Sequence, residues 1–68
     1  MKRWDCNTNR NVEDKKIDDF LGDIIKVCKK YKYSISHEDG HGAFEIGEYN
    51  ETDANWLLSS HIEKRYDT

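Results

Sequence analysis

Five consecutive residues, His37 to His41, match a pattern that zinc proteases use. They read His-Glu-Asp-Gly-His, which fits H-E-x-x-H. In that pattern two histidines four positions apart lie on one face of a helix, and the glutamate acts as the general base. Here the segment contains Asp39-Gly40, the strongest short signal for a hairpin turn, and the flanking residues alternate as strands do. We therefore reject a zinc protease and interpret the segment as a polar turn between two strands.

Other residues that could do chemistry lack the spacing that known sites require. Cys6, Cys28 and His61 are potential metal ligands, but they follow no recognised ligand spacing. The sequence contains no glycine-rich phosphate loop and no nucleophile elbow. The sequence therefore predicts that the protein is not an enzyme and binds no metal and no cofactor.

The charges are distributed unevenly along the chain. Residues 1–32 contain nine Lys or Arg and six Asp or Glu, whereas residues 33–63 contain seven acids and no Lys or Arg. An acidic surface steers a protein toward basic partner surfaces and repels nucleic acid. Trp56 is expected on the polar face of a helix, where a tryptophan is often a contact hot spot. Covering of Trp56 by the N-terminal residues or by a second copy is the alternative. The candidate partner contacts are Glu45, Glu48, Glu51 and Trp56.

One α+β domain is predicted to position these side chains. Residues 1–10 are expected to form an irregular arm, and residues 11–68 the domain. The expected elements are helix 12–31, strand 32–38, strand 42–49 and helix 52–66. This αββα order packs one antiparallel hairpin against two helices. Because two strands alone are marginally stable, we expect two copies to pair strand edges into a four-stranded sheet.

The two most regular segments predict their own packing. Eight apolar residues fall within roughly 160° of a helical wheel, which predicts one buried face. They are Ile17, Phe20, Leu21, Ile24, Ile25, Val27, Cys28 and Tyr31. In the hairpin, a turn at Asp39-Gly40 places Ile35 opposite Phe44 and Tyr33 opposite Ile46, all on one face. The second helix has two candidate caps at its start, Asn50 and Thr52.

Size and composition favour a binding surface over a buried active site. A chain of 68 residues buries only about 60 % of its unfolded surface, so its core is too thin to enclose a large pocket. No apolar run approaches the roughly 18 residues of a membrane span, and no secretory signal is recognisable. We expect a cytoplasmic protein with both cysteines reduced.

Residues 35–57 carry a resemblance to known proteins. They read Ile-Ser-His-Glu-Asp-Gly-His-Gly-Ala-Phe-Glu-Ile, followed by Tyr49-Asn50-Glu51 and Asn55-Trp56-Leu57. This segment, about a third of the chain, resembles small accessory proteins encoded by phages and prophages of low-GC Gram-positive bacteria. The resemblance implies a small phage protein that binds and inhibits or modulates a host bacterial protein, including proteins of defence systems. It implies no mechanism.

Together these observations predict a homodimeric, phage-encoded protein-binding module that acts in the bacterial cytoplasm. Its expected partner is a host protein, with neither a membrane nor a nucleic acid as partner. The alternative is a dimer that sequesters a small signalling molecule between its two protomers.

Overall fold

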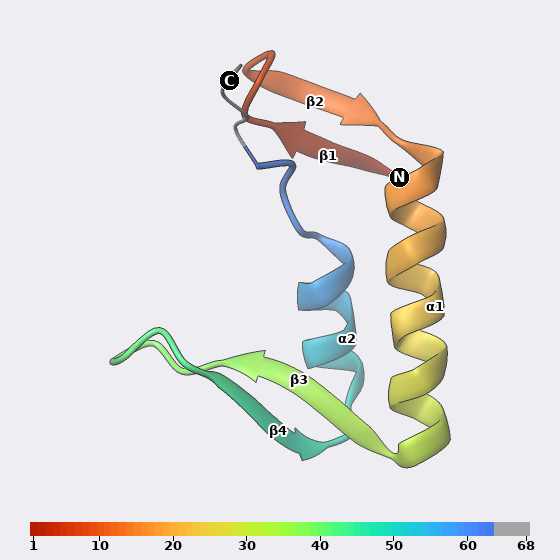
Figure 1. The fold of residues 1–68 in the computed structure, drawn as a ribbon, viewed down its shortest axis with the longest axis vertical. Helices are drawn as coiled ribbons and strands as arrows, with labels where there is room; N and C mark the ends of the chain where they lie inside the picture. Colours follow the sequence, from red (N-terminus) through yellow and green to blue (C-terminus); the bar gives the residue numbers. More distant parts are fainter. Residues whose placement is uncertain (64–68) are drawn as a thin grey trace, which may run out of the picture.

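The computed structural model describes residues 1–63 of the chain. The described elements, in chain order, are β1 (Lys2–Asp5), β2 (Arg10–Glu13), α1 (Lys15–Tyr31), β3 (Tyr33–His37), β4 (Phe44–Glu48) and α2 (Glu51–Leu58). The β1–β2 hairpin lies at the start of α1, the β3–β4 hairpin extends from its other end, and α2 lies beside α1 between them (Figure 1). This architecture confirms the α+β class. Neither described helix is long and apolar enough to cross a membrane.

Helix α1 begins later than predicted. Its N-cap is Asp14, whose carboxylate accepts a hydrogen bond from the Ile17 N–H at 3.1 Å. The predicted start at residue 12 is wrong because the residues before Asp14 pair with β1 as strand β2. The helix ends at Tyr31, as predicted.

The first ten residues do not form the irregular arm that the sequence predicted for residues 1–10. They contribute β1 and the start of β2, which pair antiparallel with Arg3 opposite Val12. The turn between the strands contains Asn9 in the left-handed region at φ 56°, a conformation that asparagine adopts more readily than most residues. The prediction failed because the residues of this hairpin show almost no alternation of apolar and polar side chains, which is the pattern that indicates a strand.

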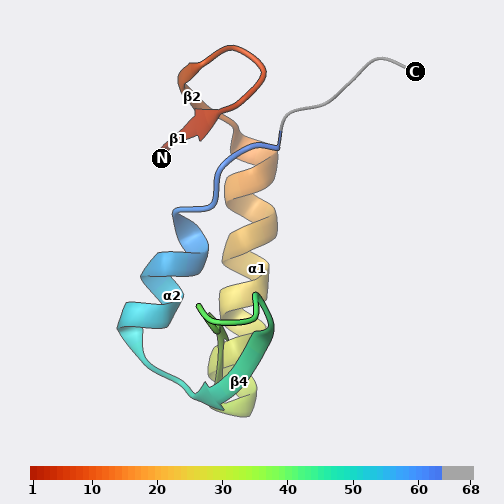
Figure 2. The ribbon, with the colours of Figure 1, turned by 90° about the vertical axis from the view of Figure 1, so that its left-hand side faces the viewer.

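Arg3 fastens this hairpin to both helices. The residue is only 3 % exposed, and its guanidinium forms an ion pair with Asp18 of α1. The same guanidinium donates to the carbonyl oxygens of Leu58 and Ser60, at 2.9 and 3.0 Å. The chain after α2 runs back to this corner, where Ile62 forms a parallel bridge with β1 (Figure 2). These contacts join β1, α1 and the end of α2.

The β3–β4 hairpin forms where it was predicted, with a register shifted by two residues. Ile35 lies opposite Ile46, where the sequence predicted Phe44. Tyr33 lies opposite Glu48, where the sequence predicted Ile46. Because the shift is by two and not by one, the same side chains still share one face of the hairpin.

The loop of this hairpin explains the shift. The Glu38 N–H donates to the Ala43 carbonyl at 2.7 Å, so these two residues close the loop. Gly42 takes the left-handed conformation at φ 70°, which moves the centre of the turn by one residue along the chain. Both strands are therefore shorter than the predicted strands 32–38 and 42–49.

Helix α2 begins near its predicted start and ends early. Asn50 is the cap, and its side chain accepts a hydrogen bond from a backbone N–H three residues later. The sequence predicted helix 52–66, but the helix ends at Leu58, whose carbonyl accepts a hydrogen bond from Arg3, and the chain then pairs with β1 through Ile62. Residues 64–66 of that prediction lie outside the described residues.

The helices cover only part of the surface that the sequence assigned to the core. In the described part of the chain, the buried apolar residues are Leu21, Cys28 and Ala54. The large apolar side chains that stay exposed are Met1, Phe20, Val27, Tyr31, Tyr33, Phe44, Ile46 and Trp56. The prediction of a single buried face on α1 is therefore wrong. The radius of gyration, 13.4 Å, also exceeds the roughly 11 Å expected for a compact domain of this length.

Candidate interaction surface

Three rings from three different elements meet on the outside of the molecule. Trp56 of α2 lies with its ring centroid 6.3 Å from that of His37, at an interplanar angle of 34°. His37 in turn meets Phe44 edge-on, with centroids 6.3 Å apart and an angle of 76°. We call these three residues the aromatic cluster. Separations of this size are typical of interacting aromatic pairs.

Local structure explains why these rings point outward together. His37 and Phe44 are directly opposite each other in the hairpin, so their side chains share one face. On α2, Ala54 is buried, and Trp56 projects from a different side because two helical positions differ by about 200°. Phe44 is 74 % exposed and Trp56 is 43 % exposed. The cluster therefore offers apolar surface to solvent at a junction between hairpin and helix.

Two surface hollows adjoin the cluster and share Trp56 and His37. The larger has a volume of about 480 Å³ and is lined by His37, Phe44, Trp56, Leu57, Ser59, Ser60 and His61. The smaller has a volume of about 270 Å³ and is lined by Ser36, His37, Asp39, Thr52, Asp53 and Trp56. The first is mainly apolar and the second carries two carboxylates. A side chain that enters the larger hollow would therefore have acidic groups nearby.

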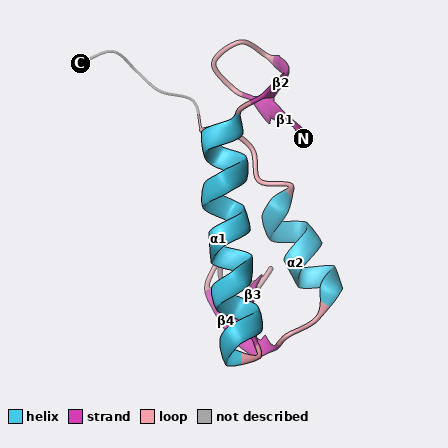
Figure 3. Ribbon diagram, turned by 90° about the vertical axis from the view of Figure 1, so that its right-hand side faces the viewer, coloured by secondary structure: helices cyan, strands magenta, loops and turns pink. Residues whose placement is uncertain are grey.

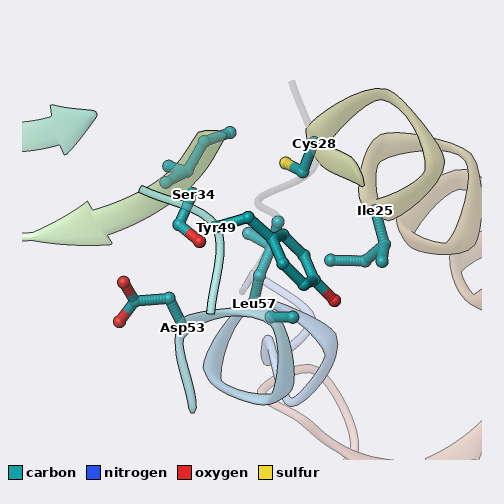
Figure 4. Close-up of a pocket in the computed structure, with 8 residues that line it drawn as sticks. Ile25, Cys28, Ser34, Tyr49, Asp53 and Leu57 are labelled. Carbon is teal, nitrogen blue, oxygen red and sulfur yellow. The ribbon is translucent and has the colours of Figure 1, made fainter. Parts of the chain in front are cut away.

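The inner side of the fold offers no comparable space. The crevice between α1, β3 and α2 is lined by residues that include Ile25, Cys28, Ser34, Tyr49 and Leu57 (Figure 4). These side chains fill the crevice and leave no volume for a water-sized molecule. Space for a partner thus lies on the outside, where the hollows beside Trp56 are two of several surface hollows.

The His-Glu-Asp-Gly-His segment forms a turn held together by its own acidic side chain. The Glu38 carboxylate accepts hydrogen bonds from the N–H groups of Gly40 at 2.7 Å and His41 at 2.6 Å. These backbone donors, followed by the His41 side chain, lower the pKa of Glu38. The His37 ring pairs instead with Asp39, at 3.5 Å. Among residues 1–63, no three His, Cys, Asp or Glu side chains lie together as metal ligands would.

The four residues predicted as partner contacts lie in different places. Glu45 and Glu48 are three positions apart in β4, so their side chains point to opposite faces of the hairpin. Glu51 lies in the first turn of α2 and accepts a hydrogen bond from the Tyr49 hydroxyl at 3.2 Å. Burial and the nearby Glu51 carboxylate raise the pKa of Tyr49. Of the four, only Trp56 belongs to the aromatic cluster.

Sequence reasoning missed His37 and Phe44 as members of a surface. His37 was assigned to the polar turn segment, and Phe44 to the apolar face of the hairpin opposite Ile35. Two predictions together could have identified them. The hairpin register places His37 and Phe44 on one face, and the following helix carries Trp56 on its polar side. A pattern shows which residues share a face, but it does not show whether another element covers that face.

No family model matches the chain, and searches of the curated proteins and of the solved structures found no match either.

Proposed function

We propose that the protein is a protein-binding module whose contact surface is the aromatic cluster. The observation that carries this proposal is the exposed arrangement of His37, Phe44 and Trp56 around a hollow of about 480 Å³. Single exposed apolar residues are normal, but contiguous ones beside a hollow are typical of interaction sites. Tryptophan in such a place is the residue most enriched among binding hot spots.

The charges near the cluster indicate what kind of partner fits. Asp39 and Asp53 line the smaller hollow next to Trp56. The whole region from residue 33 to residue 63 has seven acids and no Lys or Arg. A complementary partner would insert an apolar side chain beside Trp56 and carry Lys or Arg around it.

We further propose that this partner is a host bacterial protein and that the chain is phage-encoded. The support is the resemblance of residues 35–57 to small phage and prophage accessory proteins. These residues include the last three residues of β3, all of β4 and most of α2, which are the elements that build the aromatic cluster. In this proposal binding inhibits or modulates the host protein, and a defence protein is one such target.

Pull-down from a Gram-positive bacterial lysate, followed by mass spectrometry and direct titration of the purified partner, tests this function. We expect one stoichiometric partner that wild type retains and that Trp56→Ala and Phe44→Ala lose. Removing a hot-spot ring should raise the Kd by at least about tenfold. Tyr33→Ala is the matched control, since Tyr33 is an exposed aromatic residue at the other end of the same hairpin. A partner that binds both cluster variants as tightly as wild type would overturn the proposal.

Charge reversal provides a second arm of the same test. Asp39→Lys should weaken the complex, and raising the salt concentration should weaken the wild-type complex as well, because exposed charges are screened. Glu48→Lys should have less effect, since Glu48 lies at the far end of β4 from Phe44. An interaction insensitive to both salt and Asp39→Lys would contradict the proposed basic partner.

A second candidate function is sequestration of a small signalling molecule. The observation that favours it is the larger hollow, whose volume of about 480 Å³ falls in the range of ligand pockets and whose lining is largely aromatic. Thermal-shift screening with nucleotides separates the two functions. Stabilisation by one nucleotide that Trp56→Ala abolishes would favour sequestration, and no stabilisation by any nucleotide would remove it.

One proposed way for two copies to associate is the four-stranded sheet, which would pair them along the free edge of β4. Strand β4 pairs with β3 on one side, and its other side has no strand neighbour among the described residues. Exposed edges of this kind invite pairing with another chain. A dimer formed through this edge should dissociate in Phe44→Glu, as measured by sedimentation equilibrium.

A further inference from the structure

Helix α1 carries two neighbouring apolar stripes that differ in how far they are buried. The inner stripe consists of Leu21, Ile25 and Cys28 and packs against α2 and β3. The outer stripe consists of Ile17, Phe20, Ile24, Val27 and Tyr31. In the outer stripe Phe20 is 63 %, Val27 56 % and Tyr31 60 % exposed. Three of the five residues of the outer stripe are therefore largely exposed, whereas Ile17 and Ile24 are half-buried.

The ribbon shows a free side of this helix. Seen from the side opposite to the β3–β4 hairpin, α1 lies in front of the other described elements along its whole length (Figure 3). The second helix and both hairpins lie beside it, behind it or at its ends. In this view no described element lies between α1 and the viewer.

The spacing of the outer stripe is that of a coiled-coil seam. Its residues follow one another at intervals of three, four, three and four positions, from Ile17 to Tyr31. This is the heptad spacing of the two core positions, which keeps a stripe facing a partner helix along its length. The inner stripe is shorter and packs against α2 and β3 of its own chain. The outer stripe thus has the pattern of a helix–helix contact.

We propose that the outer stripe is the interface between two copies of this chain, which pack their α1 helices antiparallel about a two-fold axis. The occupant is a second copy because the charges that flank the stripe complement themselves in this arrangement. The flanking residues at equivalent heptad positions are Lys16, Asp23 and Lys30. Asp23 lies seven positions from each of the two lysines and has the opposite charge.

Antiparallel packing fixes how these charges meet. When Ile24 of one copy packs against Val27 of the second copy, Phe20 packs against Tyr31 of the second copy. In this register Asp23 lies beside Lys30 of the second copy, and the two-fold axis forms the same pair twice. The Lys30 ammonium already lies at the edge of the stripe, 5.3 Å from the centroid of its own Tyr31 ring.

Other arrangements lose this complementarity. Sliding the helices so that Ile24 packs against Phe20 of the second copy places Asp23 beside its own equivalent, which is repulsive. In a parallel pair, Asp23 would face the side of the helix that holds Leu21 and Cys28, where no basic side chain flanks the stripe. Among residues 1–63, the ion pair of Asp23 is an exposed one with Lys26 at 3.8 Å, which offers little competition. The charges thus select one orientation and one register.

The area of the stripe predicts a weak dimer. An aromatic side chain buries about 150–250 Å², so the exposed parts of Phe20, Val27 and Tyr31 offer roughly 300 Å² per copy. With polar flanks in the usual proportion, the interface reaches on the order of 1,000 Å² in total, near the lower limit for specific complexes. We therefore expect a dimer that dissociates on dilution. The stripe shares no residue with the aromatic cluster, so this inference does not depend on the proposed function.

Sedimentation equilibrium over a wide range of protein concentration tests the interface. Wild type is expected to pass from monomer to dimer as its concentration rises. Phe20→Glu and Val27→Glu should each raise the dimer Kd at least about tenfold, because each puts a charge into the seam. Both sites are exposed in the protomer, so circular dichroism should show that α1 is retained. Phe44→Glu is the matched control and should leave the dimer intact.

Charge exchange tests the orientation. Asp23→Lys alone and Lys30→Asp alone should each weaken the dimer, since each creates like-charge pairs across the axis. The double variant, Asp23→Lys with Lys30→Asp, should restore it, because the opposite charges meet again. Failure of the double variant to recover would overturn the antiparallel register.

Two results would overturn the interface itself. One is a wild type that stays monomeric up to millimolar concentration. The other is a dimer that survives Phe20→Glu and Val27→Glu but is lost in Phe44→Glu, which would assign dimerisation to the β3–β4 hairpin.

Discussion

The two hairpins of this molecule are built alike and held differently. Each has two short antiparallel strands, and a hairpin of this size is marginal on its own. The β1–β2 hairpin is fixed by Arg3, which reaches α1 and the end of α2 from a buried position. In the β3–β4 hairpin every residue of β4 is exposed, and Ser34 of β3 is the buried residue. One hairpin holds the fold together, and the other is available for contact.

Removal of the arginine anchor is expected to have the largest effect. Arg3→Ala leaves the carbonyl groups of Leu58 and Ser60 without their donor and should lower the free energy of unfolding by about 2–3 kcal/mol. Arg10→Ala in the same hairpin is the matched control, since Arg10 is exposed, and it should change stability by no more than about 0.5 kcal/mol. Urea denaturation measures both. Equal losses for the two variants would show that Arg3 is not the anchor.

A pH titration of stability should give the next largest difference between the hairpins. The hydrogen bond from Arg3, and then the amine of Met1, lower the pKa of Asp18. A carboxyl whose folded pKa is depressed stabilises the protein above its unfolded pKa, near 4, and this stabilisation is lost as the pH falls through the folded pKa. The urea midpoint of wild type should therefore drop below about pH 4, and Asp18→Asn should flatten that drop.

Glu38 provides the matched measurement in the other hairpin. Its pKa is also lowered, but its partners are backbone N–H groups of its own loop. Glu38→Gln should therefore flatten the acid drop less than Asp18→Asn does. If Glu38→Gln flattened the acid drop in stability more than Asp18→Asn, the β3–β4 hairpin and not the β1–β2 hairpin would be the one that holds the fold together.

The smallest expected effect on stability belongs to a large side chain. Truncation of a buried phenylalanine typically costs about 3–5 kcal/mol, but Phe44→Ala should change the free energy of unfolding by no more than about 0.5 kcal/mol. The reason is that Phe44 is already mostly in solvent in the protomer. Thermal or urea unfolding of the isolated protein at low concentration measures this. If Phe44→Ala lowered the free energy of unfolding by several kcal/mol, Phe44 would be packed against the rest of the protomer and not exposed to solvent.

The sequence predicted the elements with a strong periodic signal. The amphipathic stretch before Tyr31 gave α1, and the Asp39-Gly40 segment located the second hairpin between alternating strands. The register was wrong by two residues because Gly42, not the Asp-Gly pair, takes the positive φ. The turn was therefore predicted in the correct segment, but its centre was predicted one residue too early.

The remaining features depend on contacts that sequence periodicity does not encode. The first hairpin was missed because a charged residue, Arg3, anchors it where a pattern analysis looks for apolar ones. The candidate surface was found only through Trp56, whose place on the polar side of a helix is visible in the sequence. Phe20 was assigned to the buried face of the first helix and Phe44 to the apolar face of the hairpin. Both faces were recognised correctly, but the sequence does not show whether another element covers them.

The position of Arg3 also bears on the order in which the chain folds. Its hydrogen bonds to Leu58 and Ser60 span 55 and 57 residues of sequence, whereas α1, the β3–β4 hairpin and α2 form from neighbouring segments. Closing so long a loop costs more chain entropy than joining neighbours does, so long-range contacts tend to form late. We expect the helices and the second hairpin to assemble first and β1 to dock last. The arginine then sets how slowly the native state unravels, with little influence on how fast it is reached.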